Sequence, residues 1–358
     1  MKNLFNIGII GAGMYSRVHI SCFQLDGRAQ VTWLASRSAG PLQAVAAEFG
    51  IPNTSTDYRE MLADPALDAV VITSPPDTHA QMTVDALRAG KHVLVEKPMT
   101  TNPAGVRRIV SEAERHPELT VLECSCRHTR LQPKFRLVRQ MIAEGRLGKV
   151  YHIHHHSAYP RTFIEYNPHG AWGMYKKSAG GGPFVDWGVY DLSFHLGVLD
   201  DAPQLLRLRA FTRGDLRDLS RLAPGSDVEQ HGAAFMEFSG GLTYYYERGS
   251  GVYNNIPTQT RIQGTLGCLT LSFPTWDSPQ VIFSHAGPRR DEPARDEVLE
   301  ADFSTHPPVD PKYVPGHNDN RALVAHFLDC LQGKAAPMMP VQLAAKHLAI
   351  LFRITKTR

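Results

Sequence analysis

Short apolar runs alternate with helical patterns over roughly the first 120 residues of the chain. The apolar runs are rich in Val, Ile and Leu and lack polar alternation, which predicts strands buried on both faces. We expect these strands at Asn6–Ile10, Val31–Ala35, Ala69–Thr73, Val93–Glu96 and Thr120–Glu123. Apolar residues at a helical period predict crossover helices at Tyr15–Leu25, Pro41–Phe49, Tyr58–Leu62, His79–Ala89 and Pro103–Arg115. This alternation predicts an α/β unit with a doubly wound parallel sheet.

The pattern changes after a predicted helix at Pro133–Glu144, because the following runs are β-type and are not separated by crossover helices. We expect strands at Val150–Ala158, Leu205–Thr212, Ala233–Phe238, Leu242–Glu247, Thr258–Gln263 and Cys268–Ser272. Their spacing indicates an α+β domain with an antiparallel or mixed sheet. Two helices, Asn318–Gln332 and Val341–Phe352, follow.

Composition excludes several classes of protein. A length of 358 residues suggests two domains, and a formal charge of +3 is too near neutral to attract nucleic acid. The five cysteines form no CxxC pair and no disulfide-type spacing, which favours a reducing compartment. The sequence shows neither a secretory leader nor a run long enough to span a membrane. We therefore expect a soluble cytoplasmic protein without a membrane partner.

A glycine-rich segment, GIIGAGMYSRVH, joins the first predicted strand to a helix that begins near Met14. Gly8, Gly11 and Gly13 permit a tight turn and let backbone N–H groups approach a pyrophosphate at the helix start. Ser16 stands at the third glycine position of the dinucleotide fingerprint, where its small side chain still allows close packing. A glycine turn that binds nothing is the alternative, but strand, turn and helix in register favour a dinucleotide site.

The end of the second predicted strand lacks the carboxylate that often accepts hydrogen bonds from the adenosine ribose. Ser36 and Arg37 stand there instead, and a hydroxyl with a guanidinium can bind a 2′-phosphate. The sequence thus favours NADP as cofactor, with NAD possible. Alternatively, Arg37 is a solvated residue that stacks on adenine in either cofactor.

Three further segments carry a family likeness: TSPPDTH at 73–79, AGKHVLVEKP at 89–98 and GGGPFVDWGVY at 180–190. Together with the glycine loop, they resemble the Gfo/Idh/MocA oxidoreductases, the family of glucose-fructose oxidoreductase and inositol dehydrogenase. The likeness covers nearly the whole chain. It implies an NAD(P)-binding Rossmann domain at 1–124 and, at 125–358, a substrate-binding and oligomerisation domain with an open mixed, mostly antiparallel sheet. It also implies that the helices at 318–352 pack back near the first domain.

The resemblance assigns roles to individual residues. Lys97 matches the lysine of the family's EKP motif, which points at the substrate hydroxyl or carbonyl beside the nicotinamide. Asp186 and Tyr190 match the DxGx(H/Y) pair, in which many members have His where this chain has Tyr190. The glucose-fructose oxidoreductase and dihydrodiol dehydrogenase branches share the Tyr. The expected cofactor contacts are Gly8, Gly11, Gly13, Met14, Tyr15, Ser36, Arg37, Thr73, Ser74, Pro75, His79, Glu96 and Lys97.

The chemistry of hydride transfer favours the same catalytic residues. Oxidising an alcohol requires a base that takes the hydroxyl proton, and the reverse reaction requires an acid that returns it. A Tyr, whose unperturbed pKa is near 10, serves only if a neighbouring cation stabilises the phenolate, and Lys97 or the oxidised nicotinamide could do so. Asp186 would share a helix face with Tyr190 and bind a substrate hydroxyl or orient Lys97. Without the family context, a single Tyr is more often a core or surface residue.

Four other residues are candidates for substrate contact. His195 lines the pocket or is a hydrogen-bonded core histidine, and Arg127 contacts an anionic substrate or belongs to a solvated basic face. His169 and Trp172 lie where the family's substrate loop is found, although that loop could simply cover the sheet.

A run of histidines, HIHHH at 152–156, invites a metal interpretation, since strand alternation puts His152, His154 and His156 on one face. No Cys or carboxylate accompanies them in the sequence, so we prefer a polar sheet face at an oligomer interface and expect no metal.

The sequence thus predicts an NAD(P)-dependent dehydrogenase or reductase that moves a hydride between nicotinamide and a CH–OH carbon of a sugar, glycoside or cyclic polyol. One alternative is a redox-assisted glycosidase that retains NAD. Another is a non-catalytic dinucleotide-sensing regulator, which would be free to lose Lys97, Asp186 and Tyr190. We expect a small carbohydrate or polyol substrate, no nucleic-acid partner, and a homodimer or homotetramer formed through the second-domain sheet.

Overall fold

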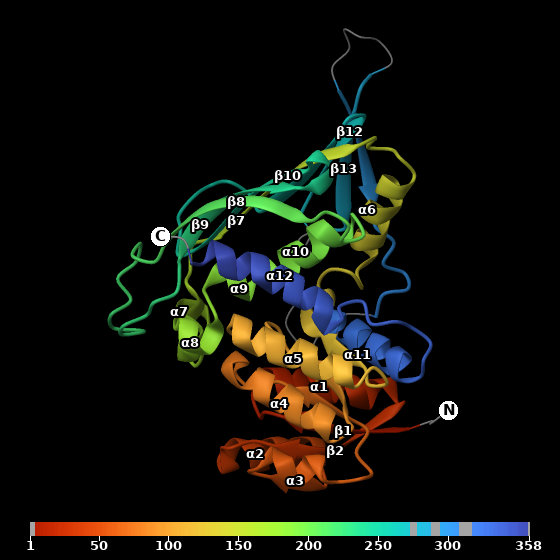
Figure 1. Ribbon diagram of the computed structural model, residues 1–358, viewed down its shortest axis with the longest axis vertical. Helices are drawn as coiled ribbons and strands as arrows, with labels where there is room; N and C mark the ends of the chain where they lie inside the picture. Colours follow the sequence, from red (N-terminus) through yellow and green to blue (C-terminus); the bar gives the residue numbers. More distant parts are fainter. Residues whose placement is uncertain (1–3, 273–277, 288–293, 308–316, 357–358) are drawn as a thin grey trace. The chain divides into compact units, whose positions relative to one another are not determined.

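The computed structural model describes residues 4–272, 278–287, 294–307 and 317–356, which fall into two compact units (Figure 1). The first unit contains residues as far as Arg127 and those between Pro307 and Lys346. The second runs from His128 to His306 and resumes at His347. The sequence predicts a second domain at 125–358 whose last helices pack near the first domain. In the structure, residues 307–346 fall in the first unit, where helix α11 (His317–Leu331) packs on helix α1 (Met14–Asp26).

The strands of the first unit form a parallel sheet of order β3-β2-β1-β4-β5-β6. They are β1 (Phe5–Ile10), β2 (Ala29–Ala35), β3 (Asn53–Ser55), β4 (Ala69–Ile72), β5 (His92–Val95) and β6 (Val121–Glu123). This order is that of the dinucleotide-binding doubly wound fold. The apolar runs form the central strands because crossover helices cover both faces, and every residue of β4 is fully buried.

The helices of the first unit begin and end at recognisable signals. They are α1 (Met14–Asp26), α2 (Ala39–Phe49), α3 (Tyr58–Leu62), α4 (Pro76–Arg88), α5 (Pro103–Arg115), the 3₁₀ turn η1 (Cys124–Cys126), and α11 (His317–Leu331). The Asn102 side chain caps α5 by accepting the N–H of Gly105, and Gly27 ends α1 in the left-handed region at φ 77°. A further helix, α12 (Val341–Ile354), begins in the first unit and ends in the second.

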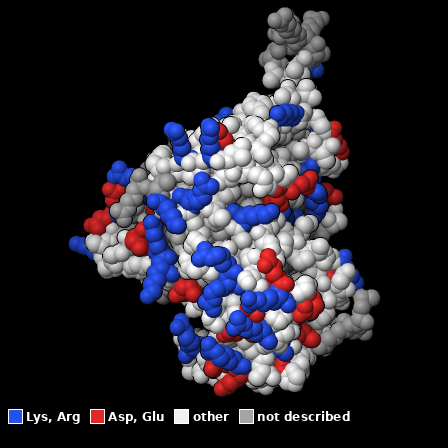
Figure 2. All heavy atoms as spheres, viewed as in Figure 1, with Lys and Arg blue, Asp and Glu red and all other residues white. Residues whose placement is uncertain are grey.

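Lys and Arg side chains gather over α4 and α5 on the face shown in Figure 2. Arg88 and Arg115 both pair with Glu112 at 3.0 and 3.2 Å, and Arg108 donates to the side chain of Gln81. These contacts are typical of a solvated helical face.

The second unit is built on a mixed sheet of order β14-β13-β12-β11-β7-β10-β9-β8, in which β7 and β10 pair in parallel and the other neighbours are antiparallel. Its strands are β7 (Val150–Tyr159), β8 (Leu205–Arg213), β9 (His231–Phe238), β10 (Thr243–Ser250), β11 (Gln259–Gly264), β12 (Gly267–Leu271), β13 (Gln280–His285) and β14 (Arg295–Glu300). The predicted mixed sheet is confirmed, and it extends over β13 and β14, which the sequence pattern did not predict.

One face of this sheet is covered by helices (Figure 1). The helical segments of the second unit are α6 (Pro133–Ala143), α7 (Phe163–Tyr166), η2 (Ala171–Met174), α8 (Lys176–Ala179), α9 (Pro183–Asp186) and α10 (Gly188–Gly197). Every residue of α10 is buried, and its His195 bonds to Tyr244 of β10 and Thr260 of β11. The segment that carries Tyr190 therefore lies against the centre of the sheet.

Candidate functional site

The loops after β1, β2, β4 and β5 lie at one edge of the first sheet, because parallel strands end on the same side. Backbone hydrogen bonds continue beyond the strand ends: Gly11 N–H donates to Ala35 O at 2.8 Å, and Thr73 N–H donates to Ile10 O at 2.8 Å. The strand order reverses between β1 and β4, which is where such sheets bind dinucleotides.

The glycine turn after β1 is crowded at Gly11 and open at Gly13. Gly11 has φ +121°, and a Cβ there would lie 2.6 Å from Thr73 Oγ1. Gly13 is the N-cap of α1, and nothing lies within 4 Å of the place where its Cβ would be. An open helix N-terminus with bare backbone suits a pyrophosphate, so the residues present fit a nicotinamide dinucleotide.

A different constraint, the packing of a neighbouring helix, requires glycine at position 8. It lies inside β1, and a Cβ there would come within 2.4 Å of Met61 Sδ on α3. The structure therefore explains Gly8 by close packing of α3 on the sheet rather than by contact with a phosphate.

Ser16 replaces the third glycine of the fingerprint without opening the turn. Its Oγ accepts the Gly13 N–H at 2.9 Å and lies 3.1 Å from Thr73 Oγ1. The hydroxyl thus ties the start of α1 to the loop after β4. The backbone amides of Met14 and Tyr15, in the first turn of α1, are available to an anion.

Arg37 is exposed beyond the end of β2, next to the half-buried Ser36. In the described part of the chain, no residue pairs with the Arg37 guanidinium. This is the side of the sheet edge where the adenosine end of a dinucleotide lies in this fold.

Glu96 holds the segment that carries Lys97. Its Oε1 pairs with the Arg127 guanidinium and lies 2.9 Å from His19 Nε2, while its Oε2 accepts the Lys97 N–H at 3.1 Å. Burial would raise the pKa of Glu96, but the Arg127 guanidinium and the hydrogen bond with His19 hold it well below its usual value. The carboxylate therefore stays ionised and fixes the backbone at Lys97, whose side chain is half-buried.

His79 fastens two loops of the same edge together. It is fully buried, with Nε2 2.7 Å from Ser74 O and Nδ1 2.9 Å from Pro98 O. Burial lowers its pKa. The structure thus gives His79 a bracing role between the loops after β4 and β5, and Thr73, Ser74 and Pro75 are half-exposed beside it.

Asp186 and Tyr190 lie on either side of a break in the helix. Asp186 ends α9, Tyr190 belongs to α10, and Trp187 stands between the two helices with φ −104° and ψ −28°. Asp186 is half-buried and Tyr190 is buried, with its ring 5.0 Å from that of His128 and 5.6 Å from that of Trp187. The expected single helix face is therefore replaced by a bend that brings Trp187 against the Tyr190 ring.

Two candidate substrate residues are core groups. Arg127 is 0% exposed, with its guanidinium paired with Glu96 and 4.9 Å from the centre of the Tyr15 ring. His195 is 0% exposed, with Nδ1 2.6 Å from Tyr244 Oη and Nε2 2.8 Å from Thr260 Oγ1. Burial lowers the pKa of His195 to about 4, so the ring is neutral. The polar groups of both residues are used inside the fold, which favours the hydrogen-bonded core histidine at position 195 and speaks against a solvated face at Arg127. Substrate contact by either residue stays a prediction.

His169 and Trp172 lie in the segment between α7 and α8, and both are exposed. The Trp172 ring meets Phe163 edge to face at 5.5 Å. Their contact with substrate stays a prediction.

A group of three possible metal ligands exists in the first unit, where side-chain atoms of His19, Glu96 and Cys124 lie within 4.8 Å of one another. The Glu96 carboxylate is already neutralised by Arg127, and burial raises the pKa of the Cys124 thiol well above its usual value. A protonated thiol beside a guanidinium does not favour a cation. On the second sheet, His152 bonds to Thr243 and His154 stacks on Tyr245 at 5.1 Å, as a polar sheet face would.

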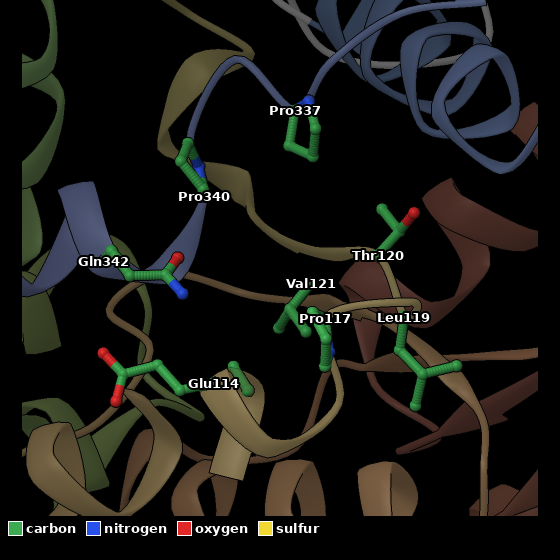
Figure 3. A pocket seen from close by; sticks show the side chains of 9 residues that line it. Glu114, Pro117, Leu119, Thr120, Val121, Pro337, Pro340 and Gln342 are labelled. Carbon is green, nitrogen blue, oxygen red and sulfur yellow. The ribbon is translucent and has the colours of Figure 1, made fainter. Parts of the chain in front are cut away.

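A pocket of about 420 Å³ lies away from the loops described above (Figure 3). It forms around the amino end of β6, opposite the edge at which the strands end. Its lining is mainly apolar: Ala113, Glu114, Pro117, Leu119, Thr120, Val121, Pro337, Pro340 and Gln342. It has no place in the chemistry of Lys97 or the glycine turn.

The strand order and the glycine turn define the first unit as a dinucleotide-binding domain. Residues 5–123 match the model of the oxidoreductase family with an NAD-binding Rossmann fold, and residues 135–270 match the GFO/IDH/MocA C-terminal domain. The chain belongs to the Gfo/Idh/MocA oxidoreductase family.

Two curated relatives, both oxidoreductases by name, each match about half of the chain. The 1,5-anhydro-D-fructose reductase of Ensifer adhaerens is 33% identical over 198 residues, which cover 55% of this chain and 57% of that protein. The inositol 2-dehydrogenase of Rhizobium meliloti (strain 1021) is 29% identical over 199 residues, which cover 55% of each chain. The chain therefore aligns with less than two thirds of the length of either relative.

Solved structures share the whole architecture. A levoglucosan dehydrogenase in complex with NADH and levoglucosan superposes with a TM-score of 0.81 at 18% identity, covering 99% of this chain and 97% of that one. An oxidoreductase domain protein from Kribbella flavida gives a TM-score of 0.80 at 21% identity, covering 99% and 97%. These likenesses establish the fold. In the described part of the chain, no helix is both long and apolar enough to cross a bilayer.

Proposed function

We propose that this chain is an NAD(P)-dependent dehydrogenase or reductase acting on a CH–OH carbon of a sugar, glycoside or cyclic polyol. The observation that carries the proposal is the arrangement of one sheet edge, where a bare glycine turn lies beside a lysine segment braced by Glu96. Both lie where doubly wound sheets bind a dinucleotide. The names of the two curated relatives, a sugar reductase and an inositol dehydrogenase, support the substrate class.

In this proposal, Tyr190 exchanges a proton with the substrate hydroxyl, and the Lys97 ammonium stabilises the negative charge that develops on oxygen. Asp186, half-buried at the end of α9, accepts a hydrogen bond from a second substrate hydroxyl. The dinucleotide, when bound, supplies hydride acceptance and donation. Turnover of a panel of sugars, glycosides and polyols, followed by nicotinamide absorbance with either cofactor, tests the proposal.

We propose NADP as the preferred cofactor because Arg37 is exposed at the end of β2 without a carboxylate beside it. The Arg37→Ala variant is expected to lose about 10- to 100-fold in NADP affinity, the value of one charge-assisted hydrogen bond, with little change for NAD. Titration of the protein fluorescence with each cofactor measures both constants. The exposed Arg107 on α5 provides the control, since Arg107→Ala should bind both cofactors as the wild type does. Equal losses for NAD and NADP in Arg37→Ala would contradict the preference.

We propose that the face of the second sheet opposite its helices forms a homo-oligomer interface. A row of directly opposed residues crosses five strands there: Arg209, Phe235, Tyr245, His154 and Arg261. Phe235 is 45% exposed in spite of its size. A Phe235→Asp variant is therefore expected to elute at a smaller mass than the wild type in size exclusion with light scattering. Leu25→Asp, at an exposed position on α1, is the control, and an unchanged mass for Phe235→Asp would rule this face out.

A further inference from the structure

A buried ion pair lies beneath the start of α10. Asp191, the residue after Tyr190, is 0% exposed, and Arg248 of β10 is 1% exposed. The guanidinium holds both carboxylate oxygens, with Nε 2.5 Å from Oδ2 and Nη2 2.7 Å from Oδ1. A planar guanidinium bound in this two-point manner fixes distance and orientation together.

Neighbouring polar side chains contact the remaining polar atoms of the Asp191–Arg248 pair. Tyr246 Oη donates to Asp191 Oδ2 at 2.6 Å, Arg248 Nη1 donates to Ser157 Oγ at 3.3 Å, and His155 Nε2 lies 3.5 Å from Asp191 Oδ1. Burial would raise the pKa of Asp191, but the Arg248 guanidinium lowers it to about 2. Burial also lowers the pKa of His155 well below its usual value. Near neutral pH, the cluster therefore contains one anion, one cation and a neutral His155.

The Asp191–Arg248 pair is linked to Tyr190 both through the backbone of α10 and through contacts of the Trp187 ring. Asp191 is joined to Tyr190 by the helix backbone, so its carboxylate anchors the first turn of α10 on β10. Arg248 lies 5.4 Å from the centre of the Trp187 ring, which in turn lies 5.6 Å from the Tyr190 ring. Gly188 shows how tight this contact is, because a Cβ there would come within 2.8 Å of Tyr246 Oη.

Stability alone does not call for an ion pair at this place, since well-packed apolar residues replace buried pairs at little or no cost. The geometry of the reaction does require a fixed position here, because the Tyr190 hydroxyl must lie within hydrogen-bond distance of the substrate hydroxyl to exchange a proton with it. We infer that Asp191 and Arg248 are positioning residues that set the Tyr190 ring through the start of α10 and through Trp187. The inference rests on the proposed role of Tyr190 in proton transfer.

The decisive variant is Asp191→Leu/Arg248→Met, which removes both charges and leaves neither one buried without its partner. It is expected to fold, with kcat about 10- to 100-fold lower than in the wild type and KM little changed, the signature of a small misplacement of the reacting group. Arg248→Lys keeps the charge but loses the two-point contact, so its kcat should lie between those of the wild type and the double variant. If the double variant does not fold, Arg248→Lys provides the test.

Trp187 emission provides a readout that does not need turnover. The difference between each protein and its Trp187→Phe counterpart isolates this ring, and loss of the Arg248 guanidinium is expected to shift its emission. If the wild type turns over no substrate, the proposed function fails, and the emission alone then decides whether the pair positions Trp187.

A matched control lies at the other end of α10. Arg130 holds both oxygens of Asp201 at 2.8 and 2.7 Å and contacts Ser193 Oγ at 3.2 Å. Arg130→Met/Asp201→Asn should alter stability but keep the wild-type kcat and Trp187 emission. Wild-type kcat in the Asp191→Leu/Arg248→Met variant would overturn the inference, as would unchanged Trp187 emission if the wild type shows no turnover.

Discussion

Replacing Tyr190 by Phe is expected to lower kcat by about 10²–10⁴-fold, the usual value of a general acid–base group. The loss should fall on kcat more than on KM, because the aromatic ring that packs between Trp187 and His128 is kept. Lys97→Met is expected to cause a loss of similar size by removing the charge that stabilises the oxyanion. Initial rates at saturating substrate and cofactor measure both effects.

The control for this loss is Tyr58→Phe, which removes a tyrosine hydroxyl bonded to Asp85 in the first unit. It should leave kcat at the wild-type value. The assignment of Tyr190 would be wrong if Tyr190→Phe kept its kcat within about tenfold of the wild type, since general acid–base catalysis is worth more than that.

Replacing Glu96 by Gln is expected to lower the free energy of unfolding by about 3–5 kcal/mol, because the Arg127 guanidinium would remain buried without its anionic partner. The folded-state pKa of Glu96 lies below its usual value of 4.5. Its contribution to stability is therefore full above that value and is lost as the pH falls toward the folded-state pKa. Urea unfolding over an acid series should show a flatter pH dependence in Glu96→Gln than in the wild type.

Glu123, buried at the end of β6, should contribute to stability with the opposite pH dependence. Burial raises its pKa to about 7, so its contribution is full below its usual value of 4.5 and is lost as the pH rises through about 7. Glu123→Gln is therefore expected to keep or increase stability above neutral pH. Equal destabilisation by Glu96→Gln and Glu123→Gln would mean that the Arg127 pair has no special role.

The buried strands of the first unit could be predicted from the sequence because each is a continuous apolar run covered on both faces. The strand β3 has only three residues, Asn53–Ser55, which is too short for any periodicity. The strand β14 has the sequence RDEVLE, lies at the edge of its sheet and is mostly exposed. Local pattern identifies strands by burial, so an uncovered edge strand gives no such signal.

The parts of the site whose residues are contiguous in sequence, such as the glycine turn and the segment that carries Lys97, could be predicted from their motifs. The ion pairs around them could not, because their members are distant in sequence: Arg127 lies 31 residues from Glu96, and Arg248 lies 57 from Asp191. For the same reason, the sequence alone cannot show that the polar groups of Arg127 and His195 are bonded inside the fold. Only the topology that brings α10 onto β10 reveals the Asp191 pair.

The most direct test of hydride transfer is the absorbance of reduced nicotinamide when the purified chain is mixed with oxidised NADP or NAD and a panel of sugars, glycosides and cyclic polyols. If the chain transfers hydride as proposed, the absorbance rises continuously over many turnovers with at least one substrate. The rise is larger with NADP and is lost in Tyr190→Phe and Lys97→Met. Absence of any rise with either cofactor, or a rise that both variants retain, would contradict the proposal.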